Sequence, residues 1–245
     1  MAVPRHIDVY GLDIAANVCQ QALREVISLP SVSMAHVLME RGAESLWHKH
    51  SRMSEVYVIL SGEGILYHGE RSLHAEPGAY LVIPPGTPHM LVNGNGSTLE
   101  HLVFASPPFD PDDVVVVDER PEQYNAPEAF WYDAPPIEAA DGALVYELMR
   151  DDERQDLGMA LAFGVLPAGR RADPHHHMVS EELYYVVNGE GTAVVGDREF
   201  GVARDSLVYV PVGYSHALEN THDSENLEVL CISSPPYSDA DFFRD

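Results

Sequence analysis

The sequence is poor in lysine and in positive charge as a whole. Lys49 is the only lysine among 245 residues, and 14 basic against 39 acidic residues give a formal net charge of −25. So acidic a chain is repelled by nucleic-acid phosphates and by anionic lipid surfaces. We therefore expect no nucleic-acid partner and no membrane partner.

Cysteine and long apolar runs are also scarce. Cys19 and Cys231 lie near opposite ends of the chain and are too few for a disulfide framework or a cysteine zinc site. No run approaches the roughly 18 apolar residues of a transmembrane helix, and the N-terminal residues contain no apolar stretch of signal-peptide length. These absences predict a cytoplasmic protein.

Histidine and glutamate occur in one pattern that is found twice. The pattern recurs after 127 residues at every position: His48, His50, Glu55 and His89 are followed by His175, His177, Glu182 and His216. Residues 42–93 and 169–220 align without a gap and are identical at 15 of 52 positions. A constant spacing of this kind indicates an internal duplication.

The texture of both copies is that of an all-β protein. From residue 33 onward, short runs rich in Val, Tyr, Leu and Ile alternate with Gly, Pro and Asn. The segments SGEG and NGEG are typical of hairpin turns, because glycine adopts positive φ without a steric penalty. Regularly spaced short strands predict a sandwich or barrel in each half.

The N-terminal region has a different pattern. Apolar residues at helical spacing behind a potential N-cap at Asp13 predict one short helix over residues 13–27; they are Ile14, Val18, Ala22 and Val26. The expected organisation has four parts: an N-terminal arm with this helix (1–30), a first barrel (31–110), a linker (111–143) and a second barrel (144–245).

The linker is rich in Pro, Asp and Glu, and a strand is expected in it at Val114 to Val117. Its beginning, SPPFDPDD, resembles the segment SPPYSDAD near the other end of the chain at an offset of 128. One residue has thus been inserted after the aligned block.

The repeated residues have the character of metal ligands. Successive side chains of a strand point to opposite faces, so His48 and His50 share a face. Glu55 follows at the start of the next strand and His89 at the start of a later one. Three imidazoles and one carboxylate suit a divalent first-row metal such as Fe, Mn, Co, Ni, Cu or Zn, and an octahedral ion would keep two positions for substrate or oxygen.

The second copy offers two adjacent carboxylates, Glu181 and Glu182. The fixed offset selects Glu182 as the ligand. The same offset leaves His176 opposite Lys49, as the outward residue between two ligands.

These residues resemble the two motifs of the cupin superfamily. The first copy reads Gly42-x5-His48-x-His50-x4-Glu55-x6-Gly62 and Gly78-x5-Pro84-x-Gly86-x2-His89-x3-Asn93, and the second copy departs once, with Asp205 where Gly78 stands. Aspartate tolerates tight turns, so a local adjustment is expected there. The resemblance implies a bicupin, with two jelly-roll β-barrels that each hold a metal.

Further side chains are candidates for substrate binding. Tyr57 and Tyr184 lie two residues beyond the glutamates and so share the interior face, as barrel core or as hydrogen-bond donors to substrate. Arg52 is either a solvated loop residue or the partner of a substrate carboxylate. Glu55 and Glu182 are ligands that can also act as bases.

Three classes of function remain open, because a fold does not fix a function. The leading hypothesis is a non-haem Fe(II) dioxygenase acting on a small organic acid or phenol. The alternative is a non-redox metal-dependent isomerase or lyase, and the third is a metal-containing small-molecule binding protein. A homodimer is expected from the resemblance, and chemistry in one barrel or in both stays open.

Overall fold

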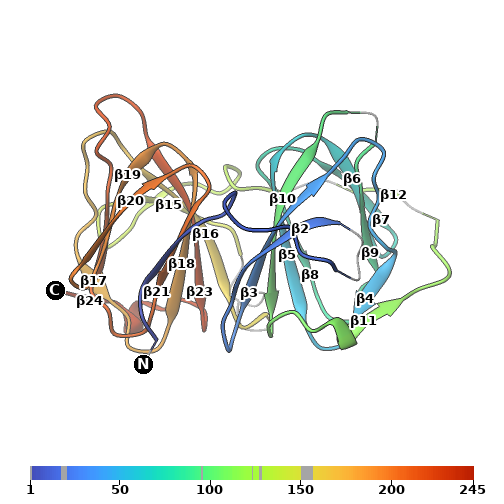
Figure 1. Cartoon of the computed structure of the whole chain (residues 1–245), viewed down its shortest axis with the longest axis horizontal. Helices are drawn as coiled ribbons and strands as arrows, with labels where there is room; N and C mark the ends of the chain where they lie inside the picture. Colours follow the sequence, from blue (N-terminus) through green and yellow to red (C-terminus); the bar gives the residue numbers. More distant parts are fainter. Residues whose placement is uncertain (1, 18–20, 95, 123, 127–128, 150–156) are drawn as a thin grey trace. The chain divides into compact units, whose positions relative to one another are not determined.

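The computed structural model describes residues 2–17, 21–94, 96–122, 124–126, 129–149 and 157–245 (Figure 1). These residues form two compact units. We call residues 12–130 the first barrel, and residues 1–11 together with 131–245 the second barrel.

The first barrel consists of two six-stranded sheets, in the orders β13-β8-β5-β10-β3-β2 and β11-β4-β9-β6-β7-β12. Its elements are β2 (Ala22–Ser28), β3 (Ser33–Met39), β4 (His48–His50), β5 (Ser54–Ser61), β6 (Gly64–His68), β7 (Arg71–Ala75), β8 (Ala79–Ile83), β9 (His89–Val92), β10 (Leu99–Ser106), the 3-10 helix η1 (Pro111–Asp113), β11 (Val114–Val116), β12 (Tyr124–Asn125) and β13 (Ala129–Phe130).

The second barrel consists of a seven-stranded sheet, β1-β21-β18-β23-β16-β15-β14, and a five-stranded sheet, β20-β19-β22-β17-β24. Its elements are β1 (Arg5–Asp8), β14 (Ile137–Glu138), β15 (Leu144–Glu147), β16 (Ala160–Leu166), β17 (His175–His176), β18 (Glu181–Asn188), β19 (Glu190–Val195), β20 (Arg198–Ala203), β21 (Ser206–Val210), β22 (His216–Glu219), β23 (Leu227–Ser234), the 3-10 helix η2 (Asp239–Asp241) and β24 (Phe243–Arg244).

The core of each barrel lies between its two sheets. Tyr57 and Leu66 belong to a buried apolar cluster of the first barrel, and Tyr184 and Ala193 occupy the matching positions in the cluster of the second. Such side chains alternate along their strands with residues that face outward. The expected architecture of two tandem jelly-roll barrels is thereby confirmed.

The predicted helix over residues 13–27 is wrong where the structure describes it. Residues 22–28 form strand β2, which pairs with β3, and Ala15 forms a bridge with Leu23; residues 18–20 lie outside the described part. A bulge between Glu25 and Ile27 buries both Val26 and Ile27. The bulge breaks the period-two alternation that marks a strand, and pairing with β3 overrides the local helical spacing.

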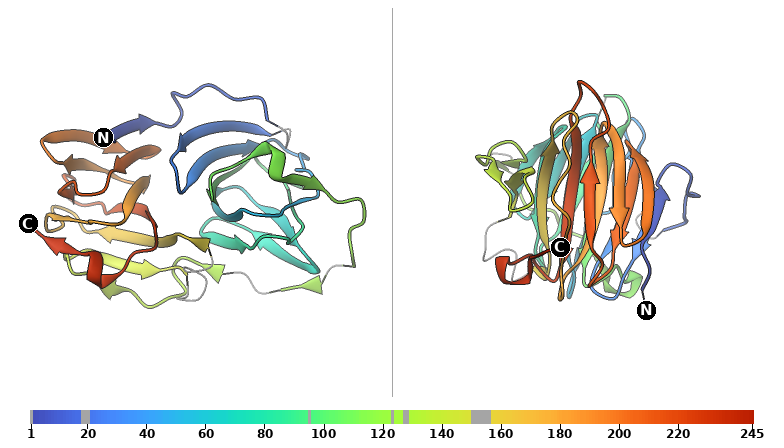
Figure 2. Two further views of the ribbon diagram at one scale, coloured as in Figure 1. Left: turned by 90° about the horizontal axis from the view of Figure 1, so that it is seen from below. Right: turned by 90° about the vertical axis from the view of Figure 1, so that its left-hand side faces the viewer.

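Strands of the expected N-terminal arm and linker belong to both barrels. Strand β1 pairs with β21 of the second barrel, and the dark blue N-terminal strand lies beside the orange strands in Figures 1 and 2. The strand expected at Val114 to Val117 is β11, which pairs with β4. The linker thus supplies edge strands to both barrels.

Asp205 makes the local adjustment expected of it. Its φ is 68°, and φ of Gly78 at the matching position is 93°. The Tyr185 hydroxyl donates to the Asp205 carboxylate over 2.7 Å, and the Val9 amide donates to the Asp205 carbonyl over 3.0 Å. Local hydrogen bonds therefore support a left-handed conformation that glycine adopts freely.

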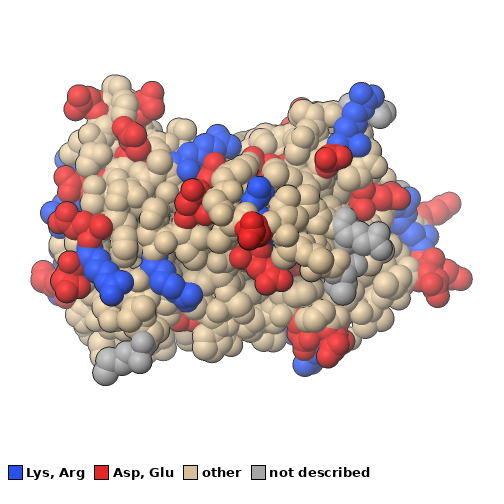
Figure 3. All heavy atoms as spheres, viewed as in Figure 1, with Lys and Arg blue, Asp and Glu red and all other residues tan. Residues whose placement is uncertain are grey.

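Charge on the surface agrees with the composition. On the face drawn in Figure 3, basic side chains are separated by acidic and uncharged ones and form no continuous patch. No helix among the described residues is long and apolar enough to cross a membrane.

Two glycines of the second barrel provide a matched test of backbone packing. Gly189 and Gly169 have φ of 86° and 66°, but a Cβ at Gly189 would lie 2.3 Å from the Asn226 carbonyl oxygen, whereas one at Gly169 would meet nothing within 4 Å. We expect Gly189→Ala to cost about 3 kcal/mol and Gly169→Ala about 1 kcal/mol of unfolding free energy. Denaturant titration measures both, and equal losses would contradict the packing argument.

Candidate metal centres

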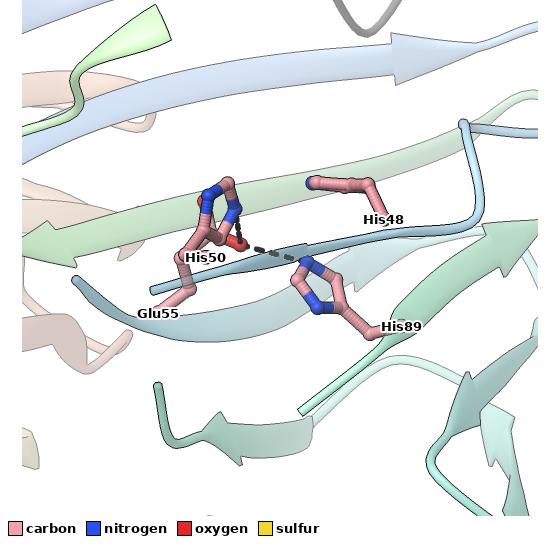
Figure 4. Close-up of side chains that lie close together, drawn as sticks. All are labelled: His48, His50, Glu55 and His89. Atoms are coloured by element: carbon pink, nitrogen blue, oxygen red, sulfur yellow. Dashed lines mark ion pairs between the residues drawn. The ribbon is translucent and has the colours of Figure 1, made fainter. Parts of the chain in front are cut away.

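The first cluster lies inside the first barrel, where three strands meet. His48 and His50 lie on β4, Glu55 near the start of β5 and His89 at the start of β9, opposite His48. One ligand atom from each of the four lies within 4.8 Å of the others, and all four side chains are buried. Figure 4 shows the three rings and the carboxylate turned toward a common point.

Main-chain carbonyls fix the orientation of each ring. The Nδ1–H of His48 donates to Leu46 over 2.9 Å, that of His50 to Asp113 over 3.3 Å and that of His89 to Thr87 over 3.1 Å. A carbonyl only accepts, so Nδ1 carries the proton and Nε2 of the neutral ring presents a lone pair. Each ring, when neutral, can therefore offer its Nε2 lone pair to a metal at the centre of the cluster.

The buried atoms at this point fit a cation. His50 Nε2 and His89 Nε2 lie 3.3 Å and 3.0 Å from Glu55 Oε2, and none of these three atoms has a hydrogen-bond partner. Leaving a buried polar atom unpaired costs on the order of 1–3 kcal/mol. A divalent metal would satisfy all of them, and three imidazoles with one carboxylate are its ordinary ligands.

Electrostatics keeps the cluster ready for a cation. Burial lowers the pKa of His48 to about 4, and the neighbouring His89 adds to the effect. Burial acts to raise the pKa of Glu55, but the His50 and His89 rings outweigh it and hold that pKa well below its usual range. Burial acts to lower the pKa of His50, but Glu55 outweighs it and raises that pKa, so a metal would compete with a proton at His50 Nε2. At neutral pH, His48 is a neutral donor and Glu55 an anion.

The second cluster repeats this geometry in the second barrel. His175, His177, Glu182 and His216 also lie within 4.8 Å by their ligand atoms. The Nδ1–H groups of the rings donate to carbonyls over 3.0, 2.8 and 3.0 Å; the acceptors are Asp173, Asp241 and Tyr214 respectively. His177 Nε2 and His216 Nε2 have no hydrogen-bond partner. The residues of this centre therefore fit a divalent metal as well.

The two tyrosines predicted beside the glutamates do face the clusters. The Tyr184 hydroxyl donates to Glu182 Oε2 over 2.7 Å, and burial together with that carboxylate raises the pKa of Tyr184 well above its usual value. The Tyr57 ring lies 5.8 Å from the His89 ring and 5.4 Å from the His101 ring. Tyr184 thus holds its proton and orients one carboxylate oxygen of Glu182.

Arg52 lies in the loop after β4 with a side chain that is 62% exposed. Its guanidinium contacts Asp110 over 2.7 Å and Asp113 over 3.4 Å. The guanidinium that could pair with a substrate carboxylate is therefore already paired with two aspartates. Its exposure and ion pairs are those of a solvated loop arginine, and substrate binding by Arg52 stays a prediction.

Sequence reasoning missed two aspartates beside the clusters. The Asp113 carbonyl accepts from His50 and the Asp241 carbonyl accepts from His177. Both residues lie beyond the aligned block, in the segments SPPFDPDD and SPPYSDAD, where they match at the offset of 128. That second offset was the signal that could have found them.

A cavity of about 280 Å³ reaches the second cluster. All four of its ligand residues line the wall, together with apolar side chains and with Tyr184, Cys231, Tyr237 and Phe242. The cavity described inside the first barrel is about 20 Å³, and the residues that line it include Tyr57 but none of the four ligands. Space for a ligand beside the metal centre is therefore described in the second barrel.

Substitutions between the copies explain the difference in volume. Gly164, Ala193 and Ala217 of the second barrel match Val37, Leu66 and Met90 of the first at the offset of 127. All three larger side chains are buried. Val37 and Leu66 belong to the buried core cluster of the first barrel, so Gly164 and Ala193 remove atoms from the interior of the second; Gly164 and Ala217 line its cavity directly.

Comparison with known sequences identifies the same two segments. The cupin domain profile matches residues 35–104 and 162–233. An uncharacterized protein of Methanocaldococcus jannaschii is 32% identical over 106 residues, which are 43% of this chain and 84% of that protein. An uncharacterized protein of Streptomyces coelicolor is 37% identical over 100 residues, which are 41% of this chain and 87% of that protein.

Solved structures with a similar fold include bacterial oxalate decarboxylases. The formate complex of the Lactobacillus farciminis enzyme has a TM-score of 0.75 at 16% identity, and the match covers 95% of this chain and 87% of that enzyme's chain. A Bacillus subtilis oxalate decarboxylase, whose centres are described as Mn(II), has a TM-score of 0.73 at 16% identity and covers 95% and 78%. At this identity the likeness shows a shared fold.

Removing one histidine from each cluster tests whether both hold metal. We expect His48→Ala and His175→Ala each to lower the bound metal from two ions per chain to about one, because each change removes one of four ligands. Elemental analysis of the purified variants measures the ratio.

His176→Ala is the matched control, since His176 neighbours His175 but its Nδ1–H donates to the Asp245 carboxylate over 2.7 Å, outside the cluster. It should keep two ions. Wild-type stoichiometry in either ligand variant would remove that cluster from the set of metal centres.

Proposed function

Since the chain belongs to the cupin family, whose profile covers more than half of its length, we propose that it is a metal-dependent enzyme with its reaction centre in the second barrel. The observation that carries this proposal is the cavity of about 280 Å³ lined by His175, His177, Glu182 and His216. A reaction needs room for substrate beside the ligands, and apolar walls exclude water from it.

The charge of the cavity favours a neutral substrate. Its lining contains five carboxylate residues and, among the described residues, no Lys or Arg; the five are Glu138, Asp141, Glu147, Glu182 and Asp239. Apart from the bound metal, a substrate carboxylate would meet no cationic side chain there, and Asp141 and Glu182 would repel it; the other three carboxylates are exposed. Of the small organic acids and phenols considered from the sequence, we therefore propose a phenol.

The reaction we propose is an iron(II)-dependent dioxygenation of that phenol. Bound Fe(II) would supply a site for both the phenol oxygen and dioxygen, since four protein ligands leave two octahedral positions. The chain's own residues would hold the substrate: Tyr237 and Phe242 line the cavity with aromatic rings, and Tyr184 keeps Glu182 in one orientation by its 2.7 Å hydrogen bond.

The alternative is a metal-dependent isomerase or lyase without a redox step. Asp141 supports it, because its carboxylate lines the cavity in the electrostatic range of His175 and Tyr184 and lies outside the ligand set. A carboxylate in that place can take a proton from a bound substrate. The Mn(II) centres of the similar decarboxylase make Mn(II) the second candidate for the metal.

For the first barrel we propose a metal that stabilises the fold. Its ligands are buried, and the cavity described there does not reach them. A metal bound by the folded state alone stabilises that state in proportion to the logarithm of its concentration.

Oxygen dependence separates the two reactions. A dioxygenase consumes O₂ as substrate is converted, so turnover should stop under nitrogen and resume in air. An oxygen electrode and anaerobic product analysis with the iron-loaded protein measure this. Unchanged turnover under nitrogen would exclude the dioxygenase and favour the isomerase or lyase.

Ligand binding tests the site and the substrate class without turnover. We expect catechol, a neutral phenol, to bind the metal-loaded protein at least tenfold more tightly than oxalate, because the side chains around the metal offer a dianion carboxylates and no cation. Gly164→Val should weaken catechol binding, since its side chain would fill space beside Val229, 3.2 Å from the added Cβ. Isothermal titration measures both.

The graded control is Gly164→Ala, which fills less of the cavity than valine. His48→Ala should leave catechol affinity unchanged, because the first cluster lies outside the cavity. Tighter binding of oxalate than of catechol would contradict the proposed substrate class, and loss of catechol binding in His48→Ala alone would move the site to the first barrel.

A further inference from the structure

The carboxylate of Asp241 accepts hydrogen bonds from the loop that joins strands β17 and β18 of the second barrel. Oδ1 accepts from the amides of Met178 and Val179 over 2.8 and 2.9 Å. Oδ2 accepts from the amide and the hydroxyl of Ser180 over 2.8 and 2.7 Å. Asp241 itself is 6% exposed. Three successive amides that converge on one buried anion fix the conformation of that loop.

The loop lies between two ligands, His177 and Glu182. The main-chain carbonyl of Asp241 also accepts the Nδ1–H of His177 over 2.8 Å. One residue therefore holds both the ring of a ligand, through its carbonyl, and the path of the chain to the next ligand, through its carboxylate.

Asp113 makes the same contacts in the first barrel. Its carboxylate accepts from the amides of Ser51, Arg52 and Met53 over 3.1, 3.0 and 3.1 Å. Its carbonyl accepts from His50 over 3.3 Å. Both barrels have this arrangement although residues 42–93 and 169–220 are identical at only 15 of 52 positions. The hydroxyl contact of Ser180 has no counterpart in the first barrel, because Met53 occupies the matching position.

We infer that Asp113 and Asp241 are positioning residues, each of which sets the geometry and the retention time of the metal in its own barrel. This inference rests on the metal centres proposed above and is independent of the reaction. In the second barrel it has a further consequence, because Phe242 follows Asp241 directly, Tyr237 precedes it by four residues, and both line the cavity. Asp241 thus joins the cavity wall to the ligand loop.

The test uses single-site backgrounds loaded with Mn(II). His48→Ala leaves the second centre, and His175→Ala leaves the first. In the His48→Ala background we expect Asp241→Asn to speed Mn(II) release to a chelator by about 10- to 100-fold, because an amide cannot accept from all four donors. The Mn(II) electron paramagnetic resonance spectrum, which reports the ligand geometry, should change with it.

Asp113→Asn in the same background is the matched control, and it should alter neither the release rate nor the spectrum of the second centre. In the His175→Ala background the two variants should exchange their effects. Ser180→Ala, which removes one of the four contacts of Asp241, should change release in the second centre by a few-fold.

Each outcome decides between distinct claims. If neither background binds Mn(II), the proposed metal centres are wrong, and the positioning role that rests on them is wrong as well. If Asp241→Asn lowers thermal stability but leaves the release rate and the spectrum unchanged, Asp241 is a structural residue only and the inference is wrong. Should Asp241→Asn fail to fold, Ser180→Ala decides, since unchanged release and spectrum in that folded variant would also overturn the inference.

Discussion

Each of the six ligand histidines donates its Nδ1–H to a main-chain carbonyl, and this bond determines where the other ring nitrogen points. The carbonyls accept on the side of each ring away from the cluster, so three Nε2 atoms and a carboxylate meet in a buried interior. Nothing else among the described residues pairs with His50 Nε2 or His216 Nε2. This convergence is maintained by the strands, by the turns after β4 and β17, and by Asp113 and Asp241.

Duplication preserved that constraint while the interiors around it diverged. In the first barrel, Val37 and Leu66 fill interior space that Gly164 and Ala193 leave in the second. His68 and His101 of the first barrel are also buried where Val195 and Val229 stand in the second. Removal of side-chain volume beside an unchanged ligand set creates a cavity without disturbing the metal geometry, because the rings are held by the backbone and not by the core.

The ligand clusters could be predicted from the sequence because their positions depend on short-range geometry. Alternation along β4 brings His48 and His50 to one face, and a fixed offset selects Glu182 over Glu181, whose carboxylate instead accepts from the Tyr209 hydroxyl. The helix over residues 13–27 was predicted wrongly because a bulge in β2 disguises the strand pattern. Asp113 and Asp241 were missed because their role depends on pairing with a loop about 60 residues away.

The cavity depends on a difference of volumes, which a search for shared residues does not detect. Gly164 and Ala217 differ from Val37 and Met90, so matching of the two copies does not select them. A comparison of the differences gives the sign of the effect: the interior positions of Val37 and Leu66 carry smaller side chains in the second barrel. In a duplicated metal protein, matched residues thus identify the centre, and the small residues among the unmatched ones identify the barrel with room for a substrate.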